Sequence, residues 1–423
     1  MNIKLPYGRT HINADLSAFE HVNVLEQAKY SPEFAESDEV RNALQNPIGE
    51  ASLSELARGK NRILLITNDM TRPMPSKITI PAIIAEIHSG NPDAEITILI
   101  ASGLHRAMTQ QELVDKMGAD VVADNRVIVH DAYDNDSLAY FGELSTGNPL
   151  WLNAELLNAD LVVSEGFIEA HWLAGYSGGR KSILPGIAGA DTVMRNHCPK
   201  HVDDKATRPG NLQDNLAHRE FTEAATKAKL AFILNVVLDK DKKIIKAFAG
   251  HPFSAHEEGC RFVNRLMSAP CKLADVTIVT NSGYPLDLNL YQSCKGLNTA
   301  SFATKEGGVI ILCTECAEGV GHGGFGEVMN MKMLPAEVLE KMHSGEIKIY
   351  DQWGAQVILN VVVKYKVIVV TDIERDIIEC MGMIYAENIA EAVDMAAEMV
   401  GHVPVINVIP EGPIIIPKGG TGA

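Results

Sequence analysis

The feature that most constrains the fold of this chain is a set of continuous apolar runs separated by helical stretches. The run over 62–67, Arg-Ile-Leu-Leu-Ile-Thr, shows no alternation of polar and apolar residues. Such a run is typical of a strand buried on both faces of a sheet, as in parallel sheets covered by helices. Because strand and helix patterns alternate along the chain, we predict an α/β fold with mostly parallel sheets.

The first part of the chain is predicted to form one such alternation. Residues 1–60 are expected to be an irregular lead-in with short helical pieces. Thr109 and Glu112 have the spacing of a capping box, which predicts the start of a helix. The predicted strands are 62–67, 95–100, 126–130, 160–164, 230–238 and 243–248, and the predicted helices include 77–90 and 254–267.

A second alternation follows Ser268-Ala269-Pro270, which is the best candidate for a domain junction. We therefore predict an N-terminal α/β domain over 1–268 and a C-terminal α/β domain over 269–423. The predicted strands of the second domain are 274–280, 308–312, 366–370 and 404–408, and its predicted helices are 289–304, 335–343 and 386–400.

The composition excludes several classes of partner. The chain has 423 residues and a formal net charge of −17, which argues against nucleic acid, whose phosphates require clustered Lys and Arg. No apolar stretch approaches the roughly 20 residues of a membrane span, and the N-terminus lacks a secretory signal. Seven scattered cysteines suggest free thiols in a reducing compartment. We expect a cytoplasmic protein, with its oligomeric state left open.

Polar residues follow three of the predicted strands directly. These clusters are Asp69/Arg72, His105/Arg106 and Glu169/His171. In open α/β sheets, ligands bind beyond the carboxyl ends of the strands, so the three clusters are predicted to face one crevice.

The glycine-rich run Ser177-Gly178-Gly179-Arg180-Lys181 permits two interpretations. Its backbone N–H groups and positive charges could hold a phosphate, although the run lacks the spacing of a Walker A loop. The alternative is a structural turn. Lys181 could be a covalent anchor or a phosphate partner, or a solvated surface lysine.

Three histidines are candidates for chemistry. His105 and His171 could be a general acid/base pair on opposite faces of a substrate, although a loop histidine often only forms hydrogen bonds that stabilise its loop. His197 could bind a metal, but one histidine and the adjacent Cys198 are too few ligands. Most ligands would have to come from elsewhere, such as a cofactor. His322, in a later glycine-rich loop, is interpreted as structural.

Cationic side chains in both predicted domains could bind a carboxylate. Arg72 can form a two-pronged contact with a carboxylate. Tyr291 and Lys295 share a helix face, so they could offer a hydroxyl and an ammonium, although such faces are commonly just solvated.

Together these motifs resemble the nickel-dependent lactate racemase family, the LarA-type 2-hydroxyacid racemases. They occur in the same order and cover about 70–353, most of the chain. The matching pieces are Asp69-Met-Thr-Arg72-Pro, Ser102-Gly-Leu-His105-Arg, Glu169-Ala-His171-Trp, Ser177-Gly-Gly-Arg-Lys181-Ser-Ile-Leu-Pro-Gly, Asn196-His197, Tyr291-Gln292-Ser-Cys-Lys295 and Asp351-Gln352-Trp353.

The resemblance implies a cofactor, a mechanism and a site between two α/β domains. The cofactor would be the nickel-pincer nucleotide, pyridinium-3-thioamide-5-thiocarboxylic acid mononucleotide, tethered to Lys181, with His197 completing the planar coordination of Ni(II). The substrate α-hydrogen would leave as hydride to the pincer carbon and could return on the other face. The implied roles are acid/base for His105 and His171, cofactor contact for Asp69, carboxylate binding for Arg72 and Lys295, and site lining for Tyr291, Gln292 and Trp353.

The substrate is less constrained than the chemistry. Lactate or another short aliphatic 2-hydroxyacid is our first choice, and a larger one, such as malate, an aromatic acid or a sugar acid, comes second. The resemblance also implies separate cofactor-maturation proteins as partners. Two alternatives belong to other classes: a zinc-dependent, phosphate-binding hydrolase using His105, His171 and His197, and a non-catalytic carrier of the nucleotide.

Overall fold

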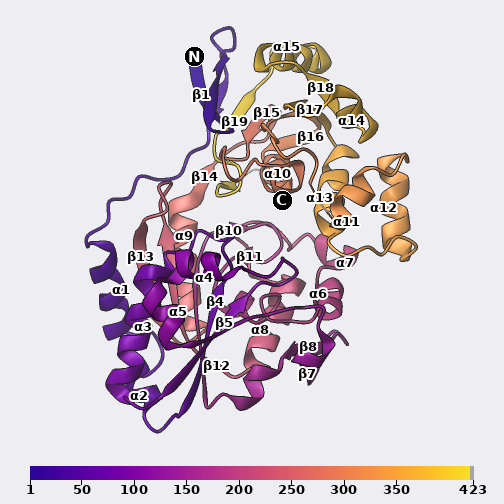
Figure 1. Ribbon diagram of the computed structural model, residues 1–423. Helices are drawn as coiled ribbons and strands as arrows, with labels where there is room; N and C mark the ends of the chain where they lie inside the picture. Colours follow the sequence, from indigo (N-terminus) through magenta and orange to yellow (C-terminus); the bar gives the residue numbers. More distant parts are fainter. Residues whose placement is uncertain (322, 420–423) are drawn as a thin grey trace.

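The chain forms two α/β units, each built on a six-stranded sheet, in a computed structural model that describes residues 1–321 and 323–419 (Figure 1). His322 and the last four residues lie outside the described part. The two sheets are largely parallel, which confirms the predicted fold class.

The first sheet has the strand order β13-β12-β9-β4-β5-β6. Its strands are parallel except for the antiparallel pair β12–β13. Later strands are added outward on both sides of the adjacent pair β4 and β9, so the strand order reverses between these two strands. The strands are β4 (Arg62–Asn68), β5 (Glu95–Ala101), β6 (Arg126–Val129), β9 (Leu161–Phe167), β12 (Leu230–Leu238) and β13 (Ile244–Gly250).

Helices cover both faces of this sheet, which explains the continuous apolar run of β4. Ile63 and Leu65 pack with residues of α1 to α4, whereas Leu64 and Ile66 pack on the other face with residues of α8. The helices of this unit are α1 (Glu36–Gln45), α2 (Leu53–Ala57), α3 (Ser76–Gly90), α4 (Gln110–Met117), α5 (Ala119–Asp124), α6 (Ala190–Asn196), α7 (Pro199–Val202), α8 (Leu216–Lys227) and α9 (Ser254–Met267). The predicted capping box of Thr109 and Glu112 is present at the start of α4.

The second sheet has the order β18-β17-β16-β15-β19-β3, and all its pairs are parallel. Its strands are β3 (Val22–Val24), β15 (Ala274–Thr280), β16 (Thr304–Cys313), β17 (Lys366–Val370), β18 (Ile384–Ala386) and β19 (Ile406–Ile409). Its helices are α10 (Leu290–Ser301), α11 (Gly323–Met329), α12 (Pro335–Ser344), α13 (Trp353–Val362), α14 (Arg375–Cys380) and α15 (Ile389–Val400).

The prediction of an irregular lead-in over 1–60 is wrong for its first part. Strands β1 (Asn2–Tyr7) and β2 (Thr10–Asp15) form an antiparallel hairpin. Ile3 and Leu5 of this hairpin join the apolar cluster between the second sheet and α15. Strand β3 extends the second sheet at β19, so residues 22–24 belong to that sheet although they lie within the proposed domain range 1–268.

The remaining elements are short. They are the antiparallel pairs β7 (Leu138–Glu143) with β8 (Pro149–Asn153) and β10 (Ala170–His171) with β11 (Gly175–Tyr176), the parallel pair β14 (Ser268–Pro270) with β20 (Ile416–Lys418), and the 3-10 turns η1 (Asn135–Ser137), η2 (Ala154–Asn158) and η3 (Gly179–Ser182).

The two units contact each other through packing and hydrogen bonds. One apolar cluster contains buried residues from both sheets and their helices. At its edge, Asp203, directly after α7, accepts hydrogen bonds from Gln356 (2.8 Å) and Asn360 (2.6 Å) of α13. Among the described residues, no helix has the length and apolar character needed to cross a membrane.

Candidate active site

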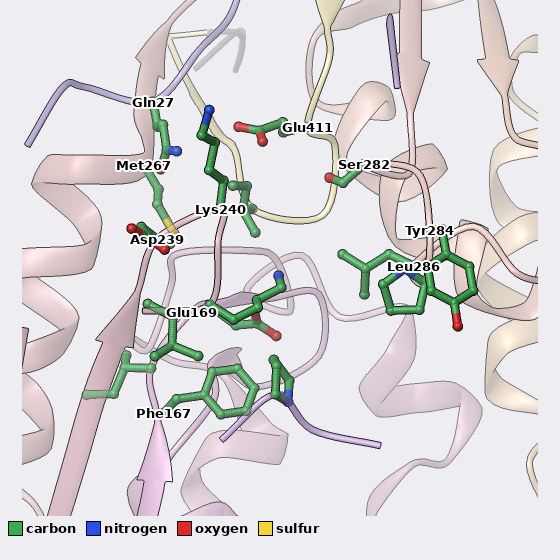
Figure 2. Close-up of a pocket in the computed structure, with 16 residues that line it drawn as sticks. Gln27, Phe167, Glu169, Asp239, Lys240, Met267, Ser282, Tyr284, Leu286 and Glu411 are labelled. Atoms are coloured by element: carbon green, nitrogen blue, oxygen red, sulfur yellow. The ribbon is translucent and has the colours of Figure 1, made fainter. Parts of the chain in front are cut away.

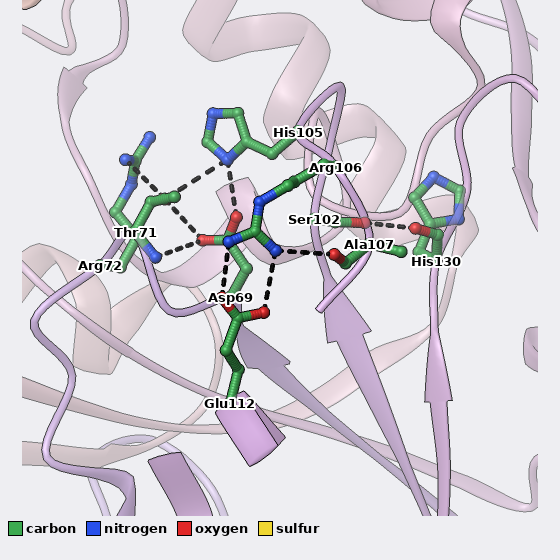
Figure 3. Close-up of polar contacts among 9 residues, drawn as sticks. All are labelled: Asp69, Thr71, Arg72, Ser102, His105, Arg106, Ala107, Glu112 and His130. Atoms are coloured by element: carbon green, nitrogen blue, oxygen red, sulfur yellow. Dashed lines mark hydrogen bonds and ion pairs between the residues drawn. The ribbon is translucent and has the colours of Figure 1, made fainter. Parts of the chain in front are cut away.

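Asp69 and His105 form a hydrogen-bonded pair at the carboxyl ends of the neighbouring strands β4 and β5 (Figure 3). The His105 Nδ1 and Asp69 Oδ2 atoms are 2.7 Å apart. Thr71 supports the carboxylate from its backbone N–H (3.2 Å) and its hydroxyl (2.6 Å), both donating to Asp69 Oδ1. An ionised carboxylate only accepts, so His105 Nδ1 carries a proton.

This pair leaves the other nitrogen of His105 available. The His105 side chain is 38% exposed while that of Asp69 is only 4% exposed. Burial alone would raise the pKa of the Asp69 carboxyl, but the hydrogen bond and charge of His105, with help from Thr71 and Arg72, lower it below its usual value. A neutral His105 with its proton on Nδ1 presents the lone pair of Nε2, the form that a general base requires.

His171, at the end of β10, is held differently. Its Nδ1 accepts hydrogen bonds from the backbone N–H groups of Leu173 (3.1 Å) and Ala174 (3.2 Å). Its Nε2 lies 2.8 Å from Nζ of Lys181, in η3. Because Nδ1 accepts, the proton of the neutral ring is on Nε2. In this arrangement His171 is a hydrogen-bond donor toward Lys181.

The surroundings of His171 and Lys181 are strongly cationic and buried. Burial lowers the pKa of His171, and the charges of Lys181, Lys295 and Arg72 lower it further. Burial likewise lowers the pKa of Lys181, together with the charges of Arg72, Arg180 and Lys295. Lys295 comes from α10 of the second unit, so charged groups from both units affect the pKa values of His171 and Lys181.

The glycine-rich run forms a structural turn. Gly178 and Gly179 have φ values of +78° and +51°, and a Cβ on Gly178 would come within 2.9 Å of the Phe167 carbonyl oxygen. The Gly179 N–H donates to Asn235 Oδ1 at 2.8 Å, and the Lys181 N–H donates to the Gly178 carbonyl at 3.2 Å. These N–H groups are therefore already used, which favours the turn interpretation over a phosphate site.

The guanidinium of Arg180 is also used in internal hydrogen bonds and is not directed at a ligand. Its side chain is 1% exposed, and its guanidinium donates to His218 Nδ1 (2.8 Å) and to the carbonyl oxygens of Ala174 (2.9 Å) and Tyr176 (3.2 Å). It also contacts His256, with 2.7 Å between Nη1 and Nε2. Arg180 thus stabilises the turn that carries Lys181 and does not offer its charge to a phosphate.

His197 directly follows α6 as its C-cap residue and has the form of a neutral metal ligand. Its Nδ1 lies 3.1 Å from the Val193 carbonyl oxygen. A carbonyl oxygen only accepts hydrogen bonds, so Nδ1 carries the ring proton and Nε2 keeps its lone pair. Burial lowers the pKa of His197 to about 3, with a further contribution from the charge of Lys181. Its ring packs against Trp353, the first residue of α13, at a centroid distance of 4.6 Å. A ring held by a backbone carbonyl in this way is usual for metal-binding histidines.

The second unit contributes side chains from α10 and α13. Lys295 Nζ donates to Gln292 Oε1 at 2.8 Å, and burial and the charge of Arg72 lower the pKa of Lys295. The Tyr291 hydroxyl donates to Asp351 Oδ1 at 2.9 Å, and burial raises the pKa of that hydroxyl. The predicted shared face of Tyr291 and Lys295 is thus partly buried and hydrogen-bonded, and is not a solvated helix surface.

Not every polar residue of the predicted clusters belongs to this crevice. Arg106 forms an ion pair with Glu112, with 2.5 Å between Nη2 and Oε1 (Figure 3). Glu169 lies at a pocket between the two units, whose lining also includes Lys240, Tyr284 and Glu411 (Figure 2). The negative charge of Glu169 acts on Lys181 and Lys295, opposing the lowering of their pKa values.

Sequence reasoning missed the residues that fix these side chains. Thr71 supports Asp69, and its place two residues after an aspartate is a recognisable local pattern. Val193 supports His197 from one helical turn earlier, a local contact, whereas Asn235 supports the turn from 56 residues further along the chain, and no local signal indicates it.

No zinc site like that of the hydrolase alternative forms in the described residues. No three His, Cys, Asp or Glu side chains come together there in a way that could hold a metal ion. His105 pairs with Asp69 and His171 pairs with Lys181, so the three histidines do not form a common ligand set.

Known proteins match the chain over nearly its full length. Residues 7–208 match the family described as the lactate racemase N-terminal domain, and residues 269–416 match the lactate racemase C-terminal domain. A lactate racemase from Thermoanaerobacterium thermosaccharolyticum is 43% identical over 98% of this chain and 99% of its own. A lactate racemase from Lactiplantibacillus plantarum is 42% identical, with the same coverage.

Solved structures show the same relationship. The lactate racemase apoprotein from Thermoanaerobacterium thermosaccharolyticum superposes with a TM-score of 0.94 at 42% identity, covering 99% of this chain and all of that one. A protein from Thermotoga maritima shares the fold, with a TM-score of 0.67 at 18% identity over 92% of this chain and all of its own. The family matches and the full-length identity agree with the motifs in the crevice, and the chain belongs to the lactate racemase family.

Proposed function

We propose that the chain interconverts the D and L forms of a short 2-hydroxyacid, with lactate as the first choice. The observation that carries the proposal is the electrostatic environment of His171. Burial, Lys295 from the second unit and Arg72 from the first act together to lower its pKa. Such a site, between two units, suits a small carboxylate.

The donor set fits the nickel-pincer nucleotide that the family implies. His197 offers one neutral nitrogen, and the described residues form no protein-only metal cluster, so a metal bound there needs ligands from a cofactor. Lys181, the proposed tether, lies within the same charged neighbourhood as His197. When bound, this cofactor supplies a hydride acceptor, which avoids forming a carbanion beside a carboxylate.

The chain's own residues bind and orient the substrate and move its proton. Arg72 and Lys295 carry the positive charge that would bind the carboxylate. His105, supported by Asp69, offers Nε2 as the base for the substrate hydroxyl. His171 is the proposed second acid/base, and this role requires its Nε2 to be released from Lys181.

The side chains around His197 favour a short substrate over a large one. Trp353 is 8% exposed and packs on the His197 ring, and Tyr291 is held by Asp351. A Trp353 ring packed on His197 would restrict a larger hydroxyacid at that position more than it restricts lactate.

The test is to express the chain with the cofactor-maturation proteins and to measure intact mass, nickel content and racemisation on the same sample. We expect added mass at Lys181, about one nickel per chain, and conversion of either lactate enantiomer to a mixture. A panel of malate, aromatic and sugar 2-hydroxyacids tests the substrate. An unmodified chain that binds zinc despite competent maturation proteins would refute the proposal.

A further inference from the structure

The contact between His171 and Lys181 determines which nitrogen atoms of the two side chains carry protons. His171 Nδ1 accepts two backbone N–H groups, so the neutral ring has its proton on Nε2 and directs it at Lys181 Nζ, 2.8 Å away. An ammonium has three hydrogens and no lone pair, so it cannot accept this hydrogen bond. An amine can. The geometry therefore matches an unprotonated Lys181.

The groups around Lys181 act mostly in the same direction. Arg72 after β4, Arg180 in η3 and Lys295 on α10 disfavour a further positive charge, and only the charge of Glu169 favours it. The pKa of Lys181 is lowered, first by burial and then by these cations. Two further side chains lie in the neighbourhood of Lys181, Phe221 on α8 and His197 directly after α6. The Phe221 ring centroid is 5.9 Å from Nζ, at the outer limit for a cation–π contact, and His197 is neutral.

We propose that His171 prepares Lys181 for attachment of the cofactor. By donating its Nε2–H to the amine it favours the unprotonated form, and the amine acts as a nucleophile when this hydrogen bond opens and frees the lone pair of Nζ. The inference rests on the proposed function, because it takes the tether at Lys181 from it. Attachment forms a bond between Nζ and the carbon of a thiocarboxylic acid. That carbon loses its oxygen as water, which takes one hydrogen from the amine and one from the acid, and no electrons are exchanged. A lysine ammonium has no electron pair for this bond.

Attachment also changes what His171 faces. The nitrogen of a thioamide shares its lone pair with the thiocarbonyl group and is a donor, so it no longer accepts the Nε2–H of His171. The hydrogen bond between Nε2 and Nζ is then lost, while the backbone N–H groups of Leu173 and Ala174 still hold Nδ1. His171 thus has two roles in sequence: it positions Lys181 before attachment, and it becomes available as an acid/base residue afterwards.

The first experiment measures the reactivity of Lys181 in the chain made without maturation proteins. Brief acetylation with acetic anhydride between pH 5 and pH 11, followed by peptide mass spectrometry, gives the pH of half-maximal labelling. The exposed Lys77 and Lys332 of the same chain report reagent decay. We expect half-maximal labelling of Lys181 at a pH well below that of an ordinary lysine, because burial and the neighbouring cations lower its pKa.

Two substitutions isolate the contribution of His171. His171→Leu removes the donor and is expected to shift the labelling midpoint of Lys181 upward by about one pH unit. His171→Gln keeps an N–H donor and is expected to shift it by less than half as much. An unchanged midpoint in His171→Leu would show that burial alone keeps the amine neutral and would overturn the role of His171.

A second measurement does not depend on substitutions. Nitrogen-15 NMR of the histidine-labelled chain distinguishes the two ring tautomers, and we expect His171 to carry its proton on Nε2 from about pH 6 to pH 8. A proton on Nδ1 would overturn the inference. If Lys181 labels only above about pH 9 in a chain that racemises lactate once loaded, the inference fails and the proposed function stands. If Lys181 labels at low pH but the chain never acquires nickel, the contact between His171 and Lys181 is supported and the proposed function fails.

Discussion

Asp69→Asn tests the pairing of Asp69 with His105. The substitution keeps the size of the side chain but replaces a buried carboxylate, 2.7 Å from His105 Nδ1, with an amide. A hydrogen bond to a charged group contributes about 1.5–3 kcal/mol, which corresponds to about 10- to 150-fold in rate. The amide can also donate to Nδ1 and so move the ring proton to Nε2, and loss of the correct tautomer costs up to about 10⁴-fold in serine proteases. We expect kcat to fall by about 10² to 10⁴.

The assay must separate catalysis from cofactor loading, because Asp69 is also the proposed cofactor contact. Racemisation of lactate is therefore measured per chain that carries added mass at Lys181 and nickel. Arg106→Gln is the matched control. It lies beside His105, but its guanidinium pairs with Glu112, so kcat should change less than about threefold. A loaded Asp69→Asn variant with kcat within threefold of the parent would refute the positioning role of Asp69.

Three further predictions concern metal binding, the turn and acid stability. His197→Ala should lose nickel while the added mass at Lys181 persists, by intact-mass and metal analysis, whereas loss of both together would contradict a ligand role. Gly178→Ala should lower the free energy of unfolding, measured in urea, by at least about 3 kcal/mol, because the new Cβ would meet two oxygens at 2.7 and 2.9 Å. Gly319→Ala is the control: it also has a positive φ, +72°, but nothing lies within 4 Å of its Cβ, so it should cost only about 1–2 kcal/mol. The lowered pKa of Asp69 stabilises the fold above about pH 4, and this stability is lost on acidification, so Asp69→Asn should lose less unfolding free energy than the parent between about pH 5 and pH 3.

The strands of the first sheet were predictable because burial on both faces leaves a local mark. Ile63 and Leu65 face one helical layer and Leu64 and Ile66 the other, so positions 63 to 66 of β4 are all apolar. The carboxyl-end rule then placed Asp69 and His105 together, as the structure confirms. Neither step needed information from distant residues.

The parts that failed depend on contacts between distant residues. The three-residue β3 is a strand because Asn407 and its neighbours in β19 pair with it, and nothing local to 22–24 requires that pairing. The sequence left open whether Arg180 offers its charge to a phosphate or belongs to a structural turn. The answer depends on the hydrogen bonds that its guanidinium donates to His218 and to the carbonyls of Ala174 and Tyr176. A sequence gives the residue types of a site, whereas the direction of each donor depends on the packed backbone around it.

The two proposed acid/base histidines are not equivalent in this chain, and the difference follows from their partners. His105 is bound through Nδ1 to a carboxylate that stays in place, so its Nε2 is available before any cofactor arrives. His171 is bound through Nδ1 to backbone N–H groups and through Nε2 to the amine that is the proposed site of attachment. A racemase needs a proton carrier on each face of the substrate. A chain with a free Lys181 therefore has one carrier ready and the other engaged, and converting that amine into a thioamide removes the acceptor that engages it.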